Sequence, residues 1–273
     1  MIKKICVGVV ISVFSLSAIA VNLPKTDAVP GGIVIIPLKL NSKHAPKVYY
    51  KKSRVLVKKI NHEWRAVVGI PLSAKSGQHT LRIVEAQKNS TLAFSVRPKT
   101  YPEQRLQIKN KRMVNPYKKD LDRIFREKKI IVASLKHWRD TDAELAPFLQ
   151  PVTGRFSSPF GLRRFFNDQA RKPHSGLDIA APEGTPVYAP TNGKVINVGD
   201  YFFNGKTVFL DHGQGLITMY CHLNSIDVKK NDVINRGDKF ATVGMSGRVT
   251  GPHLHWSVSL NNARVDPKLF LPN

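Results

Sequence analysis

The chain has 273 residues, 42% of them hydrophobic, which is enough for two modest domains with cores of their own. It carries 43 lysines and arginines against 19 acidic residues, a formal net charge of +24, and only two cysteines. This composition excludes a disulfide-rich scaffold and predicts attraction to polyanions. Nucleic acid is the usual polyanion, but the sequence contains no recognition motif for it.

Residues 1–20 have the pattern of a secretory signal peptide. Two lysines precede an apolar run over residues 5–16, and residues 18–20 (Ala-Ile-Ala) match a cleavage site. The apolar run is short for a membrane span, so an anchor is the less favoured interpretation. Cleavage would leave Cys221 as the only cysteine, and no intrachain disulfide is then expected. Export predicts a periplasmic or secreted protein and argues against nucleic acid as a partner.

Residues 21–97 predict a small, β-sandwich-like N-terminal domain. Short β-favouring runs alternate with turn-forming residues, and the runs cover residues 32–36, 47–50, 54–57, 64–70, 80–84 and 92–96. Residues 21–150 hold 27 basic and 10 acidic residues, against 14 and 9 in residues 151–273. We expect this basic half to hold the protein on anionic envelope polymers; simple solubility is the alternative explanation.

Residues 98–149 predict a basic linker followed by a helix. Asn115 is a suitable N-cap with Pro116 in the first helical position, which predicts a helix over residues 116–138. Five apolar residues fall near helical spacing on one face and should be packed: Leu121, Ile124, Phe125, Val132 and Leu135. The helix is either a strut between domains or, together with the N-terminal domain, a cover for a functional groove.

Residues 150–273 predict an antiparallel β domain without a convincing helix. β-favouring runs cover residues 187–190, 193–198, 206–211, 216–222 and 256–260. Turn signals such as Asn192-Gly193 and Asn204-Gly205 separate them. The chain as a whole is therefore expected to be mainly β.

Four side chains in this region have the pattern of a metal site. His253 and His255 are two apart on a predicted strand and would share one face of it. His174 and Asp178 are four apart, and Pro173 and Gly176 argue against a helix there, so an extended segment would also place them on one face. Two imidazoles and a carboxylate suit a divalent transition metal and leave a fourth position for water.

The surrounding motifs resemble the LytM/lysostaphin-type zinc metalloendopeptidases over residues 150–272. The resemblance rests on the order and spacing of four stretches, Arg155–Arg163, Pro173–Asp178, Tyr220–Leu223 and Gly244–Trp256. It implies an antiparallel β core with a groove between loops, one of them residues 165–172. By position in the family motif, zinc would be held by His174, Asp178 and His255. The N-terminal domain looks like the β domain that often precedes the catalytic domain in proteobacterial members.

The same resemblance makes His222 and His253 the catalytic histidines that do not bind metal. One would take a proton from the attacking water, and the other would stabilise the oxyanion or protonate the leaving amine. The sequence leaves open which histidine does which. Strand alternation puts Tyr220 and His222 on one face and Cys221 on the other, so we expect Cys221 in the core, with Tyr220 either packed or reaching the site.

The resemblance, together with the export signal, implies a zinc-dependent peptidoglycan endopeptidase. Its expected substrate is the D-Ala–meso-diaminopimelate cross-link of a Gram-negative wall, and its expected location is the periplasm. A regulatory or recruiting envelope protein would be a further partner, and no stable membrane insertion is expected after signal cleavage. The alternative is a non-catalytic LytM-type binding module that activates cell-wall amidases. The presence of every ligand and catalytic position argues against it.

Overall fold

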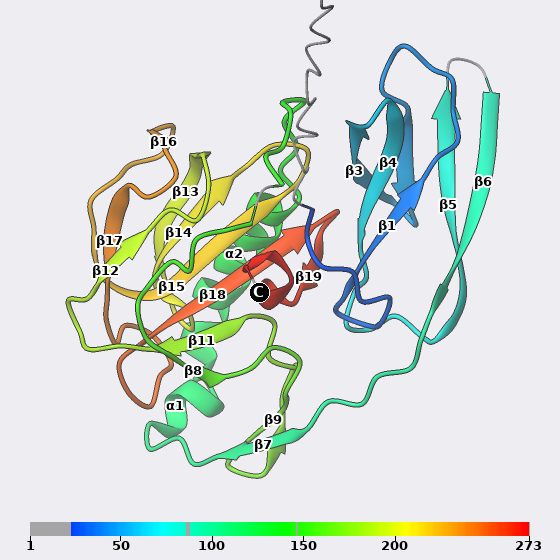
Figure 1. Ribbon diagram of the computed structural model, residues 1–273. Helices are drawn as coiled ribbons and strands as arrows, with labels where there is room; N and C mark the ends of the chain where they lie inside the picture. Colours follow the sequence, from blue (N-terminus) through cyan, green and yellow to red (C-terminus); the bar gives the residue numbers. More distant parts are fainter. Residues whose placement is uncertain (1–22, 86–87, 146, 273) are drawn as a thin grey trace, which may run out of the picture.

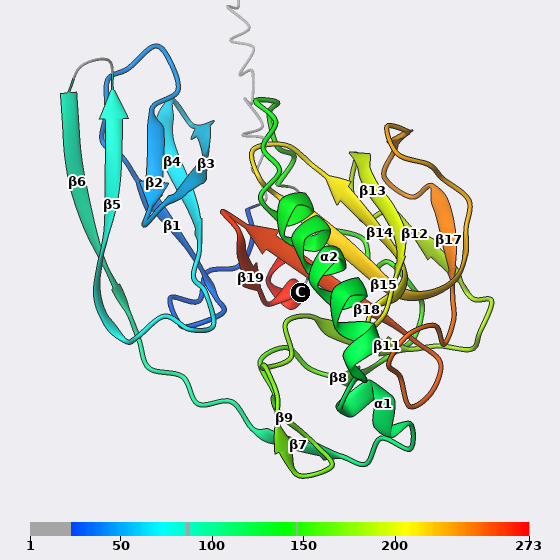
Figure 2. The same cartoon turned by 180° about the vertical axis from the view of Figure 1, so that it is seen from behind.

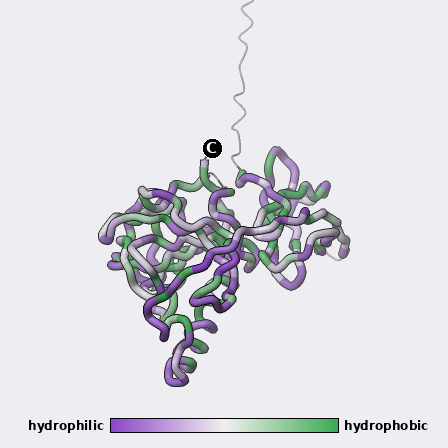
Figure 3. Tube along the Cα trace, turned by 90° about the horizontal axis from the view of Figure 1, so that it is seen from below, coloured by the Kyte–Doolittle hydropathy of each residue, from purple (hydrophilic) through white to green (hydrophobic). Residues whose placement is uncertain are grey.

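The computed structural model describes residues 23–85, 88–145 and 147–272 (Figure 1). The predicted signal peptide, residues 1–20, lies outside these ranges. Within them no helix is long and apolar enough to cross a membrane. The chain forms two lobes of unequal size (Figure 3), and both are built from antiparallel strands, which confirms the mainly β prediction.

The smaller lobe is the six-stranded β domain predicted for the N-terminal half. Its strands follow the order β1-β4-β3-β2-β5-β6. The beginning of β3 pairs with β2 and the rest of it with β4, so the two halves of the sheet wrap a shared apolar core. The strands are β1 Ile33–Pro37, β2 Lys47–Tyr50, β3 Ser53–Ile60, β4 Glu63–Gly69, β5 Gly77–Glu85 and β6 Lys88–Val96.

The connector between the lobes holds one strand and two helices, β7 Glu103–Leu106, α1 Lys111–Val114 and α2 Lys118–Leu135. The predicted start of the long helix is wrong by two residues, because Asn115 ends α1 and is not the N-cap of α2. The Asp120 carboxylate instead accepts a hydrogen bond from the backbone N–H of Tyr117 and pairs with Arg112. This contact satisfies a free N–H at the helix start.

The apolar face predicted for the long helix is only partly packed. Ile131 and Leu135 pack on the sheet of the larger lobe, where Glu127 also accepts a hydrogen bond from the backbone of Phe202. Three other residues of the predicted face are exposed: Leu121, Phe125 and Val132. The helix therefore presents a different side to the sheet than its apolar periodicity predicts. Figure 2 shows α2 lying across the back of the larger lobe.

The larger lobe is an antiparallel sheet whose main path runs β16-β13-β14-β15-β18-β11-β8. A small second sheet, β10-β9-β7, joins the connector to this lobe. The elements of the larger lobe, including β9 and β10 of the small sheet, are β8 Arg155–Ser158, β9 Arg163–Phe166, β10 Gln169–Ala170, β11 Leu177–Ala180, β12 Pro186–Tyr188, β13 Gly193–Tyr201, β14 Gly205–Asp211, β15 Ile217–Ile226, β16 Val233–Ile234, β17 Lys239–Val243, β18 His253–Leu260, β19 Ala263–Val265 and the 3-10 helix η1 Pro267–Phe270.

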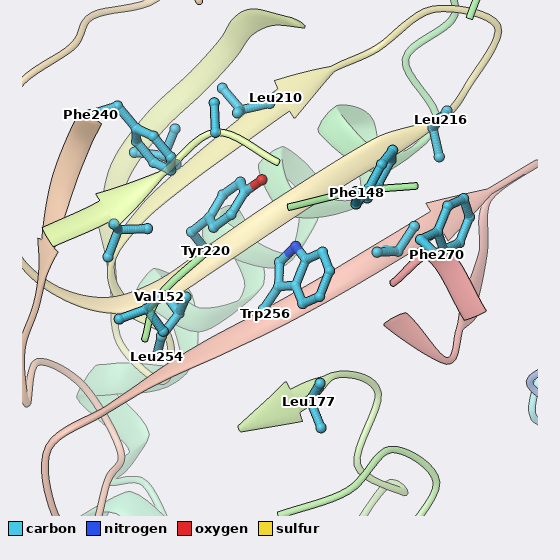
Figure 4. Close-up of a cluster of buried hydrophobic side chains, with 14 of the residues drawn as sticks. Phe148, Val152, Leu177, Leu210, Leu216, Tyr220, Phe240, Leu254, Trp256 and Phe270 are labelled. Carbon is cyan, nitrogen blue, oxygen red and sulfur yellow. The ribbon is translucent and has the colours of Figure 1, made fainter. Parts of the chain in front are cut away.

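One face of the large sheet is closed by a dense aromatic core. Trp256 of β18 and Tyr220 of β15 lie fully buried beside Phe148, Phe240 and Phe270 (Figure 4). The β15 and β18 backbones are thereby held rigidly from one side. Their other face carries the polar side chains of the candidate site at one end and supports α2 at the other.

Candidate metal centre

Three of the predicted site residues meet where β11 and β18 lie side by side. Asp178 and His255 are directly opposite each other in the antiparallel pairing of these strands, and His174 lies just before β11. The Nε2 atom of His174 is 3.0 Å from Oδ1 of Asp178 and 3.1 Å from Nδ1 of His255, and the third side of the triangle is 2.7 Å. The three atoms converge on one point, although residues 174 and 255 are far apart in the chain.

The remaining nitrogen of each imidazole is bound to the protein. Nδ1–H of His174 donates to the carbonyl of Pro159 at 2.8 Å, which leaves Nε2 as a lone pair. Nε2–H of His255 donates to Oγ of Ser257 at 3.0 Å, and that hydroxyl in turn donates to the carbonyl of Ser175 at 3.0 Å. These partners assign the tautomers, so both imidazoles direct a lone pair toward Asp178.

Three converging acceptors without a proton between them favour a cation at their centre. A tetrahedral ion about 2.0–2.2 Å from each atom needs the atoms about 3.3–3.6 Å apart, which a modest widening of the triangle provides. Burial lowers the pKa of His255 to about 4, so this imidazole is neutral at pH 7. The residues therefore fit a zinc-like metal.

Arg164 supports the carboxylate from the other side and was not predicted from the sequence. Its Nη2 donates to Oδ2 of Asp178 at 2.7 Å, so that Oδ1 alone points into the triangle. Arg163 and Arg164 are adjacent, and the sequence does not show which of them turns inward on β9. Ser257, which fixes the His255 tautomer, could have been found, because it lies two residues after His255 on the same strand face.

The two further histidines lie beside the triangle. The ring centroids of His222 and His253 are 4.9 Å apart, and Nε2 of His253 is 4.0 Å from Oδ1 of Asp178. Nδ1–H of His222 donates to the carbonyl of Ser246 and Nδ1–H of His253 to that of Gly251, both at 2.8 Å. Each imidazole thus keeps Nε2 free to exchange a proton. Burial, reinforced by the neighbouring His253 and His255, lowers the pKa of His222 well below its usual value.

The prediction that His222 shares a strand face with Tyr220 is wrong. Tyr220 is fully buried in the aromatic core, and Cys221 packs on the opposite face near α2, as expected for an alternating strand. A bulge in the β14–β15 pairing then follows, and His222 takes a positive φ of 64°. This left-handed residue turns the imidazole away from the face of Tyr220 and toward His253. Tyr220 itself contacts the hydroxyl of Thr218 and takes no part in the site.

Comparison with known proteins places the chain in a family. A crystal structure of a proposed M23 peptidase from Pseudomonas aeruginosa superposes with a TM-score of 0.77 at 44% identity, covering 90% of this chain and 96% of that one. The chain belongs to peptidase family M23. The family model described as "Peptidase family M23" matches residues 172–267, and "Peptidase family M23 N-terminal domain" matches residues 26–99. The LytM-type resemblance and the family assignment of the N-terminal β domain are confirmed.

Curated M23 relatives match the larger lobe. Peptidoglycan DD-endopeptidase ShyB of Vibrio cholerae is 45% identical over 94 residues, which is 34% of this chain and 22% of that protein. DD-carboxypeptidase/endopeptidase Mpg of Neisseria meningitidis is 38% identical over 116 residues, 42% of this chain and 27% of that protein. The matches thus span only about a quarter of the length of these two relatives.

Proposed function

We propose that this M23 protein is a zinc-dependent peptidoglycan endopeptidase of the bacterial cell envelope. The observation that carries the proposal is the triangle of His174, Asp178 and His255, with its lone pairs directed inward and two further histidines beside it. Its relatives named as peptidoglycan DD-endopeptidases support the substrate class. The bond we propose is the D-Ala–meso-diaminopimelate cross-link, and the proposed location is the periplasm, reached through cleavage of residues 1–20.

His174, Asp178 and His255 would hold the metal. When bound, zinc lowers the pKa of a coordinated water to about 7 and polarises a carbonyl oxygen. Arg164 keeps the Asp178 carboxylate oriented and ionised, and Ser257 keeps the His255 lone pair on the site. The aromatic core behind β15 and β18 prevents the strands from shifting.

His222 and His253 would move the protons of the reaction. Both have Nε2 available and Nδ1–H anchored to a backbone carbonyl, so each ring has a fixed direction. One would accept the proton of the attacking water at Nε2. The other, in its protonated form, would donate to the leaving amine or to the oxyanion. Because backbone carbonyls hold both rings in place, the enzyme would not lose entropy by ordering these side chains during turnover.

The alternative is a binding module that activates amidases without catalysis of its own. Within the described residues, the retention of the whole metal triangle together with both histidines favours the enzyme. Purified mature protein incubated with diaminopimelate-type sacculi, with and without a zinc chelator, separates the two. Mass spectrometry should show chelator-sensitive conversion of cross-linked muropeptide dimers to monomers. Zinc-loaded protein that releases no monomers would refute the proposal.

A further inference from the structure

The connector contributes a strand to the candidate site, although it precedes the larger lobe in sequence. β7 pairs in parallel with β9, with Gln104 opposite Arg164. Backbone bonds from Arg163 N–H to Pro102 and from Asn167 N–H to Leu106, at 2.9 and 3.0 Å, hold both ends of the pairing. Figure 1 shows β7 and β9 beside each other below β8 and β11. The side chain of Gln104 is thereby placed next to the arginine that holds Asp178.

Gln104 and Arg164 form a closed hydrogen-bond network with Ser158 of β8. Nε of Arg164 donates to Oε1 of Gln104 at 3.1 Å, and Nε2 of Gln104 donates to Oγ of Ser158 at 3.2 Å. Nη2 of Arg164 donates both to that hydroxyl at 3.1 Å and to Oδ2 of Asp178 at 2.7 Å. The guanidinium is rigid and planar, so holding its Nε edge also fixes the direction of Nη2.

A further arginine lies near Arg164. Arg248 is partly buried, and its desolvation, with the added repulsion of Arg164 and Arg171, lowers its pKa to about 10. The side chain of Arg164 is itself 18% exposed, so rotation outward into solvent is the alternative to its inward position. Gln104 opposes that rotation, because it offers the Nε edge an acceptor on the inner side. If Arg164 moved away, the second oxygen of Asp178 would lose its donor and the carboxylate would be free to turn.

We propose that Gln104 is a positioning residue that holds Arg164 on Asp178 and so sets the affinity of the site for its metal. The inference rests on the metal site of the proposed function. The connector would then be part of the site and not merely a link between lobes. Groups that orient metal ligands typically change metal affinity 10- to 100-fold when they are removed. We expect Gln104, which acts through one intermediate side chain, at the lower end of that range.

The test measures the zinc dissociation constant of the full mature chain by competition with a chromophoric chelator, without peptidoglycan. Gln104→Leu should weaken zinc binding about 10-fold. Gln107→Leu is the matched control, because Gln107 lies three residues further along the connector, is exposed and is absent from this network. Its zinc affinity should stay within about twofold of wild type. Equal affinities of Gln104→Leu and wild type would overturn the inference.

A double variant separates positioning from general destabilisation. Arg164→Ala should weaken zinc binding at least as much as Gln104→Leu, and adding Gln104→Leu to it should change little, because Gln104 acts through Arg164. If the two substitutions weakened zinc binding independently, so that the fold-changes of the single variants multiplied in the double variant, the inference would be contradicted. Should Gln104→Leu fold poorly by circular dichroism, Gln104→Ala gives the same comparison without added bulk. A chain that shows this order of affinities but cleaves no sacculi would refute the hydrolytic function and leave the role of Gln104 standing.

Discussion

His79 of the smaller lobe and the histidines of the candidate site differ in how their nitrogens are used. In the smaller lobe, His79 contacts the Tyr50 hydroxyl at 2.7 Å and the Lys75 carbonyl at 2.8 Å, so both nitrogens are satisfied within the fold. Each of the four site histidines in the larger lobe binds a protein acceptor through one nitrogen and directs the other at the site. The difference supports these four histidines of the larger lobe as the candidate site.

His212 shows that position in the larger lobe is not sufficient. It is buried, its Nδ1 contacts the carbonyl of Asn192 and its Nε2 the hydroxyl of Thr218, both at 2.7 Å. Burial lowers its pKa, as it does for His255. A lowered pKa therefore reflects burial in both residues, and the nitrogen that His255 directs at the site distinguishes it from His212.

The largest expected effect comes from breaking the metal triangle. His255→Ala or His174→Ala should abolish both stoichiometric zinc binding and hydrolysis of sacculi, because two ligands cannot hold the ion as three do. Metal content per chain by mass spectrometry and muropeptide release measure the two effects. His79→Ala is the control from the smaller lobe and should retain both. Loss of zinc in His79→Ala would erase the contrast between the lobes.

A smaller effect is expected from the histidines beside the triangle. His222→Ala should keep bound zinc and reduce turnover about 10²- to 10⁴-fold, because it removes proton transfer without removing a ligand. His253→Ala should behave in the same way. Zinc content and initial rates on sacculi are the measurements. Full activity in His222→Ala would show that the bulge at this residue serves packing alone.

The contact between the lobes should contribute to stability without affecting the metal. The buried Asn261 side chain accepts from Gly69 N–H at 2.7 Å and donates to Gly69 C=O at 2.9 Å. Asn261→Ala leaves both backbone groups without this partner and should lower the free energy of unfolding by about 1–3 kcal/mol. Urea denaturation of the full chain measures this effect. An unchanged zinc dissociation constant is expected, and a shift in it would mean that the lobes are coupled through the site.

The smallest effect concerns the basic charge of the smaller lobe. Replacing the exposed Lys43 and Lys47 by Gln should weaken binding to sacculi about two- to fivefold at low ionic strength, and the difference should shrink in high salt. The matched control replaces the exposed Lys229 and Lys230 of the larger lobe. Co-sedimentation measures both pairs. Equal effects of the two pairs would show that the charge of the whole chain matters and not its concentration in one lobe.

Local patterns predicted much of this molecule. Alternating apolar residues bounded by turn formers placed all six strands of the smaller lobe within a few residues of their observed ends. The same period of two anticipated that His253 and His255 lie on one face of a strand, where the structure has them. The helix was predicted with the wrong start and the wrong packed face, because Asp120 and Glu127 form polar contacts that apolar periodicity does not register.

The sequence by itself determined most of the strands and the family motifs, since these depend on spacing within short segments. Spacing indicated two pairs of candidate ligands, and the resemblance to the family singled out the three residues that meet in the metal triangle. Tertiary structure decided which way His222 faces, because a bulge is a property of the β14–β15 pairing and not of one strand. It also decided that Arg164, and not Arg163, supports Asp178, and that Gln104 from the connector holds Arg164 in place. These contacts join residues 14 and 60 positions apart, and no local periodicity encodes them.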